Sequence, residues 1–206
     1  MGVCGSSIDV DMPRSAVRPS ADRILAAAER LFANKGYGEV SLRQLIAAAG
    51  VSTTAFYARF DSKAAVLDTL TERLFAELQI EAAMTLRNVR DFDEGIERGV
   101  DILCNRFTPR KPLVRLVIAE SGSLAPMLST RRKSYVTLVE LLGHFLRALG
   151  ERGRIRVTDP QALAWALVGA LEMQIVRWAV WDEIETDELR GALLGVARAI
   201  LPKERS

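Results

Sequence analysis

The chain has few of the residues on which most metal and redox sites depend. Its 206 residues include one histidine, two cysteines and only 6% aromatic residues. A single histidine excludes a site built on several histidines, and Cys4 and Cys104 are too few and too far apart for a disulfide framework or a metal cluster. We therefore expect no metal, no cofactor and a cytoplasmic location.

Common catalytic motifs are also missing. The sequence contains no GxSxG, no P-loop and no GxGxxG, which are signatures of many hydrolases, nucleotide-binding enzymes and dehydrogenases. Carboxylate pairs do occur, but on helix faces where exposure to solvent explains them. These absences argue against an enzyme.

One hydrophobic run is long enough to need an explanation. Residues 163–181 read LAWALVGALEMQIVRWAVW. A membrane span of this length is just possible, but Glu172, Gln174 and Arg177 lie in its middle and no other segment supports insertion. We expect no membrane partner. A helix that is apolar on nearly every side needs two partners, so one face should meet the body core and the other a second subunit.

The rest of the sequence is typical of a helical globular protein, with 49% hydrophobic and 26% charged residues. Apolar residues recur at helical spacing in seven segments: residues 21–35, 65–86, 92–107, 113–121, 127–149, 163–181 and 189–201. We predict an all-α protein of about nine helices. It would comprise a flexible N-terminal arm, a three-helix head and a larger helical body, at residues 1–19, 20–66 and 67–206.

Residues 40–60, VSLRQLIAAAGVSTTAFYARF, predict two short helices joined by a glycine-centred turn. Ser41 and Ser52 are suited to cap the N-termini of the two helices, and Gly50 can end the first one with a positive φ. The second helix would turn Phe56 inward. This pattern is that of a helix-turn-helix, which places its second helix in the major groove of DNA.

The outward side of this unit supplies the predicted DNA contacts. We expect base contacts from Thr53, Thr54 and Arg59. The other predicted DNA-binding residues can contact the phosphate backbone of DNA or cap the helices that do so: Ser41, Arg43, Ser52, Tyr57 and Lys63. For Tyr57, packing against the fourth helix is an alternative role.

Lys63 has a particular place in this set. It falls in the first turn of the fourth helix, after the possible capping residues Asp61 and Ser62. A cation there opposes the helix dipole, so a nearby phosphate is its expected partner.

With these residues identified, the chain resembles the TetR-like family of bacterial transcriptional repressors. The resemblance covers roughly residues 22–67, and it rests on residues 24–28, Leu31, Phe32, Gly36, residues 49–52, Phe56, Tyr57, Phe60, Ser62 and Lys63. Three positions depart from the family pattern. Ile46, Thr54 and Ala64 stand where the family usually has an alanine, a glycine and an acidic residue.

The resemblance implies a homodimeric, ligand-responsive repressor. Two identical heads would read a palindromic operator in double-stranded DNA, and a small-molecule effector in the body would release it. The apolar residues 163–181 and the stripe in residues 189–201 are expected to form a four-helix dimer interface with a second copy. Two alternatives remain open: an activator of the same fold, or a helical small-molecule-binding protein whose head docks to a protein.

The body also contains residues suited to an effector pocket. Aromatic and flexible apolar side chains would form its walls: Phe107, Met127, Phe145, Trp165, Met173 and Trp178. Polar side chains within apolar helices would orient the ligand: Glu120, His144 and Glu172. Each has a structural alternative. The tryptophans are often core or interface residues, His144 can be structural or exposed, and Glu172 can pair with an arginine.

Overall fold

The computed structural model describes residues 17–87, 89, 92–120, 125–153 and 155–201. All regular secondary structure in this part of the chain is helical. In chain order the elements are α1 (Val17–Lys35), α2 (Leu42–Ala49), α3 (Thr53–Tyr57), α4 (Lys63–Leu86), α5 (Phe92–Phe107), the 3₁₀ turn η1 (Thr108–Arg110), α6 (Lys111–Glu120), α7 (Ala125–Glu151), α8 (Pro160–Ala179) and α9 (Leu189–Ile200). The predicted all-α fold is confirmed.

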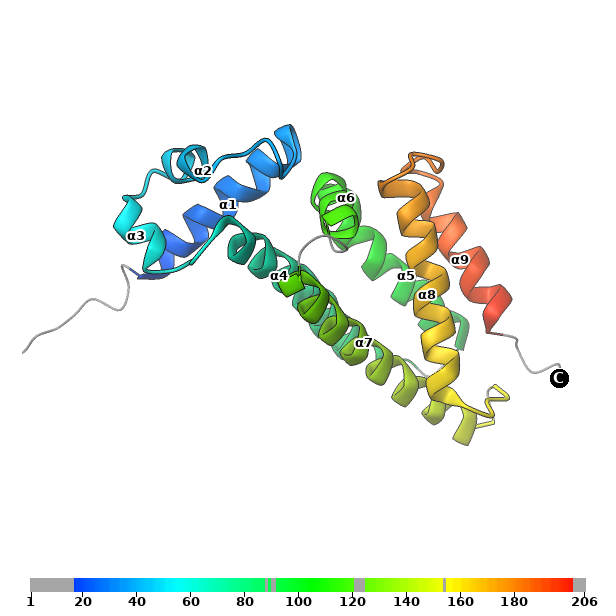
Figure 1. Cartoon of the computed structure of the whole chain (residues 1–206). Helices are drawn as coiled ribbons and strands as arrows, with labels where there is room; N and C mark the ends of the chain where they lie inside the picture. Colours follow the sequence, from blue (N-terminus) through cyan, green and yellow to red (C-terminus); the bar gives the residue numbers. More distant parts are fainter. Residues whose placement is uncertain (1–16, 88, 90–91, 121–124, 154, 202–206) are drawn as a thin grey trace, which may run out of the picture.

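Local capping explains the head, in which α1, α2 and α3 pack together (Figure 1). Ser41 Oγ accepts from the amide of Gln44, and the Gln44 side chain accepts from the amide of Ser41, which is a complete capping box. Gly50 ends α2 with φ 62° and ψ 37°, in the left-handed region that glycine adopts without steric cost. Ser52 caps α3 through the amide of Ala55. The predicted helix-turn-helix is therefore present.

The helix α4 connects the head to the body. It begins at the head with Ser62 as its N-cap and runs down into the body, where α7 lies alongside it (Figure 1). Buried leucines on α4 recur from the head to the body, which gives both parts a continuous apolar core: Leu67, Leu70, Leu74, Leu78 and Leu86.

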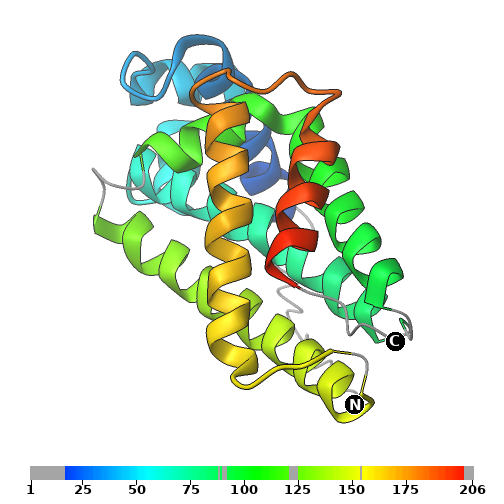
Figure 2. The ribbon, with the colours of Figure 1, turned by 90° about the vertical axis from the view of Figure 1, so that its right-hand side faces the viewer.

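The remaining helices complete the body. α5 packs on α4 and α9, and α8 packs on α7 and α9. In Figure 2 the helices α8 and α9 lie side by side at the front of the molecule, with no other helix covering them. α6 packs against both α1 and α8, so it joins the head to the far side of the body.

Helix boundaries differ from the sequence prediction mainly at N-termini. α1 begins at Val17, before the predicted start at residue 21, and α6 begins at Lys111. Pro112 lies in the first turn of α6 and Pro160 at the start of α8, where the missing amide hydrogen costs nothing. α7 runs through Gly150 to Glu151 instead of ending before it. The sequence predicted that Pro112 and Pro160 separate helices, whereas each lies in the first turn of a helix. Residues 1–16 of the predicted arm lie outside the described residues.

The apolar helix α8 is buried on one side only. Ala164, Leu167, Val168 and Ile175 face the core, whereas Trp165 and Met173 are 47% and 46% exposed on the opposite side. In the described part of the chain, no helix is both long enough and apolar enough to cross a membrane. The expectation that one face of this helix meets the body core is met.

Candidate functional site

The outward side of the head brings together most of the predicted DNA contacts. Thr53, Thr54 and Arg59 are exposed, on or just after α3, and Tyr57 is 52% exposed. Arg43 is also exposed, on the first turn of α2. The arrangement offers hydroxyl groups and guanidinium groups on one short helix and its surroundings, which suits contact with base edges and phosphates.

The inward side of α3 fixes this surface in place. The Phe56 ring is fully buried and meets the Phe60 ring at a centroid distance of 6.0 Å. Tyr57 packs edge-on against Phe56, with ring centroids 5.6 Å apart, while much of its ring stays exposed. The aromatic residues therefore anchor a helix of only one and a half turns, and the tyrosine has both a packing role and an accessible hydroxyl.

Lys63 makes contacts within the head that the sequence did not predict. Its ammonium donates to the carbonyl oxygens of Tyr37 and Val40 at 2.6 and 2.8 Å and lies 4.1 Å from the centre of the Tyr37 ring. These partners are in the segment between α1 and α2. The cation at the N-terminus of α4 thus stabilises the turn of the head, because carbonyl oxygens compensate for the unfavourable helix dipole. Lys63 thus has a structural role in the head, and its expected contact with a phosphate stays a prediction.

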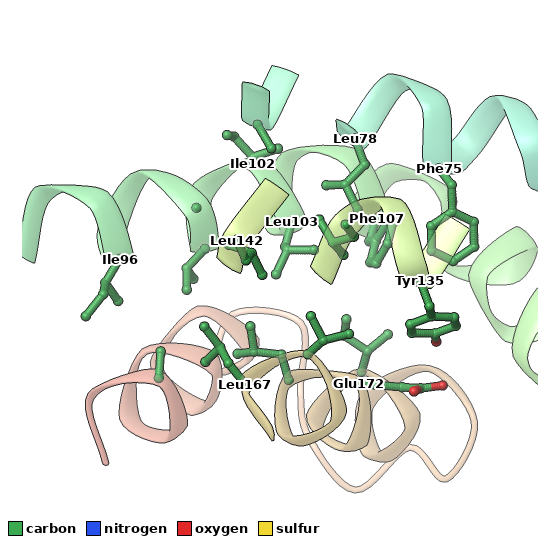
Figure 3. A pocket seen from close by; sticks show the side chains of 18 of the residues that line it. Phe75, Leu78, Ile96, Ile102, Leu103, Phe107, Tyr135, Leu142, Leu167 and Glu172 are labelled. Atoms are coloured by element: carbon green, nitrogen blue, oxygen red, sulfur yellow. The ribbon is translucent and has the colours of Figure 1, made fainter. Parts of the chain in front are cut away.

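A cavity of about 130 Å³ lies inside the body, enclosed by α4, α5, α6, α7, α8 and α9. Most of its wall consists of leucine, isoleucine, valine and phenylalanine side chains, and Figure 3 shows these projecting toward one another from several helices. Tyr135 and Glu172 are the lining residues with polar side chains among those described. The cavity can take an apolar small molecule with a polar group at one end.

Three of the predicted ligand residues line this cavity: Phe107, Phe145 and Glu172. They come from α5, α7 and α8, and Phe107 and Phe145 form part of its apolar wall. The side chains of Glu120 and Met127, which were also predicted, lie outside the described residues.

Four predicted ligand residues lie elsewhere, and helix geometry explains each case. Trp178 is fully buried in the core, with its indole N–H donating to Thr186 Oγ1 at 3.1 Å. His144 is exposed on α7, although its neighbour Phe145 faces the cavity, because adjacent helical residues point about 100° apart. Trp165 and Met173 lie on the outward face of α8, opposite its cavity-facing residues.

The polar end of the cavity includes a network of described side chains, Arg131, Tyr135 and Glu172. The Arg131 guanidinium contacts the Glu172 carboxylate and donates to the Tyr135 hydroxyl at 3.1 Å. Burial raises the pKa of the Tyr135 phenol, and its hydrogen bond to Glu172 adds to the rise, against the opposing effect of Arg131. Burial opposes the charged form of Arg131, but Tyr135 and Glu172 raise its pKa above the usual value. The phenol thus stays neutral and the guanidinium charged at neutral pH.

Sequence reasoning missed Arg131 and Tyr135. Arg131 belongs to a run of basic residues that we interpret as solvated, yet its side chain is only 18% exposed. The i, i+4 spacing of the two residues on α7 was the available signal, because it places them on one helix face. The proposed pairing of Glu172 with an arginine was correct.

Ion pairs connect the head to the body close to this cavity. Arg110 Nε donates to Glu29 Oε1 on α1 at 2.8 Å, and Arg110 NH1 donates to Glu77 Oε2 on α4 at 3.1 Å. Arg73 on α4 pairs with Asp22 on α1 at 2.9 Å. Arg110 directly precedes α6, whose residues line the cavity wall. Arg110 therefore links the segment before α6 to α1 of the head and to α4.

The outward surface of α8 and α9 is apolar and lined by small residues. Trp165, Met173 and Trp181 are each about half exposed. A Cβ atom added to Gly169, Gly191 or Gly195 would meet no other heavy atom within 4 Å, so these positions are open to solvent. Exposed large apolar side chains beside open glycine positions are typical of a helix–helix interface.

Comparisons with known proteins agree with this architecture. Residues 24–70 match the sequence model of the family described as bacterial regulatory proteins, tetR family. The fold matches that of a protein of Syntrophomonas wolfei assigned to the TetR family of transcriptional regulators, with a TM-score of 0.79 and 20% identity over 89% of this chain and 95% of that one. The chain is therefore similar to TetR-family proteins in the sequence of its head and in its fold. Its head and its helical body both have counterparts in proteins of this kind.

Two curated relatives are HTH-type transcriptional regulators named EthR. The TetR-like chain is 35% identical to EthR of Mycolicibacterium smegmatis over 99 residues, 46% of each protein. It is 31% identical to EthR of Mycobacterium tuberculosis over 132 residues, 60% of this chain and 61% of that protein. The chain thus matches less than two thirds of the length of these relatives. Both are named as regulators of transcription and neither as an enzyme.

A ligand-bound structure shares the fold as well. The structure is that of Thermus thermophilus FadR, a transcriptional repressor in complex with lauroyl-CoA. It matches with a TM-score of 0.66 and 24% identity over 87% of the TetR-like chain and 92% of that protein.

Proposed function

We propose that the chain is a transcriptional repressor that binds a palindromic operator in double-stranded DNA as a homodimer and is released by a small molecule. The exposed polar surface of α3, held in place by the buried Phe56, carries this proposal. Its location would be cytoplasmic, where it meets the DNA. The division into a head at residues 20–66 and a body at 67–206 remains part of the proposal, with α4 running through the boundary.

In the proposed complex, Thr53, Thr54 and Arg59 contact base edges, and Arg43 and Tyr57 contact phosphates. Ser41 and Ser52 already use their hydroxyl oxygens as helix caps. They would therefore support DNA binding by placing α2 and α3 correctly and by presenting the backbone amides of the first turn of each helix to phosphates. Arg43 and Arg59 supply the positive charge of this surface.

The proposed dimer interface is the outward surface of α8 and α9. Burial of Trp165, Met173 and Trp181 against a second copy would remove exposed apolar surface from water, and the open glycines would allow the helix backbones to approach closely. Two heads related by a two-fold axis would then read half-sites with centres roughly 34 to 36 Å apart, or a multiple of this spacing.

The proposed effector acts through the cavity. A ligand shifts the population only if it binds the DNA-binding and the released arrangements unequally. The cavity wall includes Val114, Val117 and Ile118 of α6, and Arg110 of η1, directly before α6, donates to Glu29 of the head. A ligand that displaces α6 would therefore move the head and change the spacing between the two heads of the dimer.

Selection of duplexes from a random-sequence pool tests the DNA-binding function. We expect a palindrome to be enriched, and its affinity to fall steeply as salt rises. Failure to obtain any specific complex at physiological salt would contradict the proposal and favour docking of the head to a protein. A reporter gene placed behind the selected palindrome then separates a repressor from an activator.

Two variants separate base contacts from phosphate contacts. Thr54→Val should change which bases the protein prefers, whereas Arg43→Ala should weaken binding to all duplexes and reduce the salt slope by about one. Equal losses on every sequence for both variants would contradict these roles. Lys133→Ala, on the exposed surface of α7 away from the head, is the control for loss of one cation.

A further inference from the structure

The wall of the cavity is apolar except at one end, and this restricts the chemistry of its ligand. Over most of its length the described lining consists of hydrocarbon side chains, from Ile96 at one end to Phe75 near the other. Figure 3 shows Tyr135 and Glu172 next to each other at the Phe75 end. A ligand that fills the cavity is therefore apolar along its length and meets polar atoms at one end only.

Among the described side chains at this polar end, the charges of Arg131 and Glu172 offset each other. Arg131 contacts Glu172, and the side chains are 18% and 28% exposed. The Tyr135 hydroxyl accepts from the same guanidinium, and the nearby Glu172 carboxylate contributes to the raised pKa of the phenol. An anionic ligand group would meet the Glu172 carboxylate, and a cationic group would compete with Arg131 for it. Either charged group would lose its hydration without gaining an unpaired partner among the described lining residues, which is costly.

We infer that the effector is an uncharged, elongated apolar molecule with one hydrogen-bonding group, such as an alcohol, ester or amide, at the Arg131–Tyr135–Glu172 end. This inference rests on the proposed function only in taking the cavity as the effector site. The Tyr135 phenol can donate a hydrogen bond to a neutral group, and the Glu172 carboxylate can accept one. Neither bond requires the Arg131–Glu172 ion pair to break.

The cavity volume sets the size of the ligand. One water-sized position requires roughly 10–15 Å³ by the same measure, so a cavity of about 130 Å³ holds on the order of ten such positions. A methylene group is similar in size to a water molecule. The ligand that fits without displacing the wall therefore has on the order of ten non-hydrogen atoms.

A series of primary alcohols tests the apolar wall. Binding of alcohols with roughly six to twelve carbons to the full-length protein, without DNA, is measured by calorimetry. We expect the affinity to rise about fourfold for each added methylene and then to level off near ten non-hydrogen atoms. An affinity that does not depend on chain length would overturn the inference.

Alcohols, carboxylates and primary amines of equal length test the charge requirement. At neutral pH we expect the alcohol to bind at least about tenfold more tightly than the alkanoate and the alkylammonium. A carboxylate or an ammonium that binds as tightly as the alcohol would overturn the neutral class. This comparison needs no variant, so it does not depend on the folding of a mutant.

Glu172→Gln provides the second arm. Without the carboxylate, the Arg131 guanidinium loses its ionic partner, so alkanoate binding should strengthen by about tenfold or more relative to the alcohol. Glu183→Gln is the matched control, because Glu183 also pairs with an arginine of α8, Arg177 at 2.9 Å, but does not line the cavity. Glu183→Gln should leave the affinities for the alcohol and for the alkanoate unchanged. The inference is wrong if the two variants behave alike.

Direct binding separates this inference from the proposed function. A chain that binds the alcohols as expected but no DNA would contradict the regulator and leave the ligand class intact. A chain that binds an operator but prefers a charged ligand would contradict the ligand class alone.

Discussion

Two glycines one turn apart on α5 allow a quantitative test of the cavity wall. Gly95 and Gly99 both line the cavity. A Cβ atom on Gly99 would meet nothing within 4 Å, whereas one on Gly95 would lie 2.7 Å from Phe145 Cζ and 3.1 Å from Val89 Cγ1. The positions share a helix and a cavity, and differ in the space that is open to one methyl group.

The free energy of unfolding should respond in different ways to alanine at these positions. Gly99→Ala should stabilise the protein by about 1 kcal/mol, because alanine loses less backbone entropy than glycine in a helix interior. Gly95→Ala gains the same amount, but the contact with Phe145 forces that ring to move at a cost of about 1–3 kcal/mol. The Gly95 variant should therefore be less stable than the Gly99 variant by about 1–3 kcal/mol.

Urea unfolding followed by circular dichroism measures this difference. All proteins are compared at one concentration, because dimerisation would make the apparent stability depend on it. The comparison between the two variants removes the helix-propensity contribution, which they share. If both variants are stabilised equally, the close approach of α5 to Phe145 and the open space at Gly99 are not as described, and the reasoning about the cavity is refuted.

Three further predictions concern coupling, assembly and pH. A bound alcohol is expected to weaken operator binding by some factor, which fluorescence anisotropy measures. Arg110→Ala should reduce that factor by about threefold or more, because the segment before α6 loses its bonds to Glu29 and Glu77. An unchanged factor argues against coupling through Arg110. Trp165→Asp should raise the dimer dissociation constant about a hundredfold, because a two-fold interface contains two copies of the residue. Analytical ultracentrifugation measures this constant, and an unchanged value would mean that the interface lies elsewhere. The hydrogen bond from Lys111, together with Arg115, lowers the pKa of Asp182, so the stabilisation is present above the unfolded pKa and is lost as pH falls through the lower folded value. Asp182→Asn should therefore reduce the loss of stability between about pH 5 and pH 3, measured by urea unfolding, and an unaltered acid profile would contradict this pairing.

Local signals in the sequence predicted the head in detail. Ser41, Gly50 and Ser52 act on neighbouring backbone groups within four residues, so their capping roles can be read without knowledge of the rest of the chain. The same local logic could not predict the carbonyl partners of Lys63, because Tyr37 and Val40 belong to a segment more than 20 residues away. Its partners depend on how α4 crosses the head.

The body was predictable as helices but not as a site. Phe145 and His144 are adjacent in sequence, and only the rotation of α7 against its neighbours decides that the first lines the cavity and the second meets solvent. For the same reason, aromatic residues on α8 could not be divided in advance between cavity, core and outer surface. The sequence did not indicate that Arg131 pairs with Glu172, because the two residues are 41 positions apart.

The sequence by itself determined what depends on neighbouring residues: the helical fold, the helix-turn-helix with its caps, and the apolar character of the segment that became α8. Only the tertiary structure decided which faces of the body helices meet, and hence the cavity, its neutral polar end and the ion pairs from α6 to the head. Helical periodicity identifies an apolar face but does not specify its partner, because that choice depends on packing between segments that are far apart in the chain.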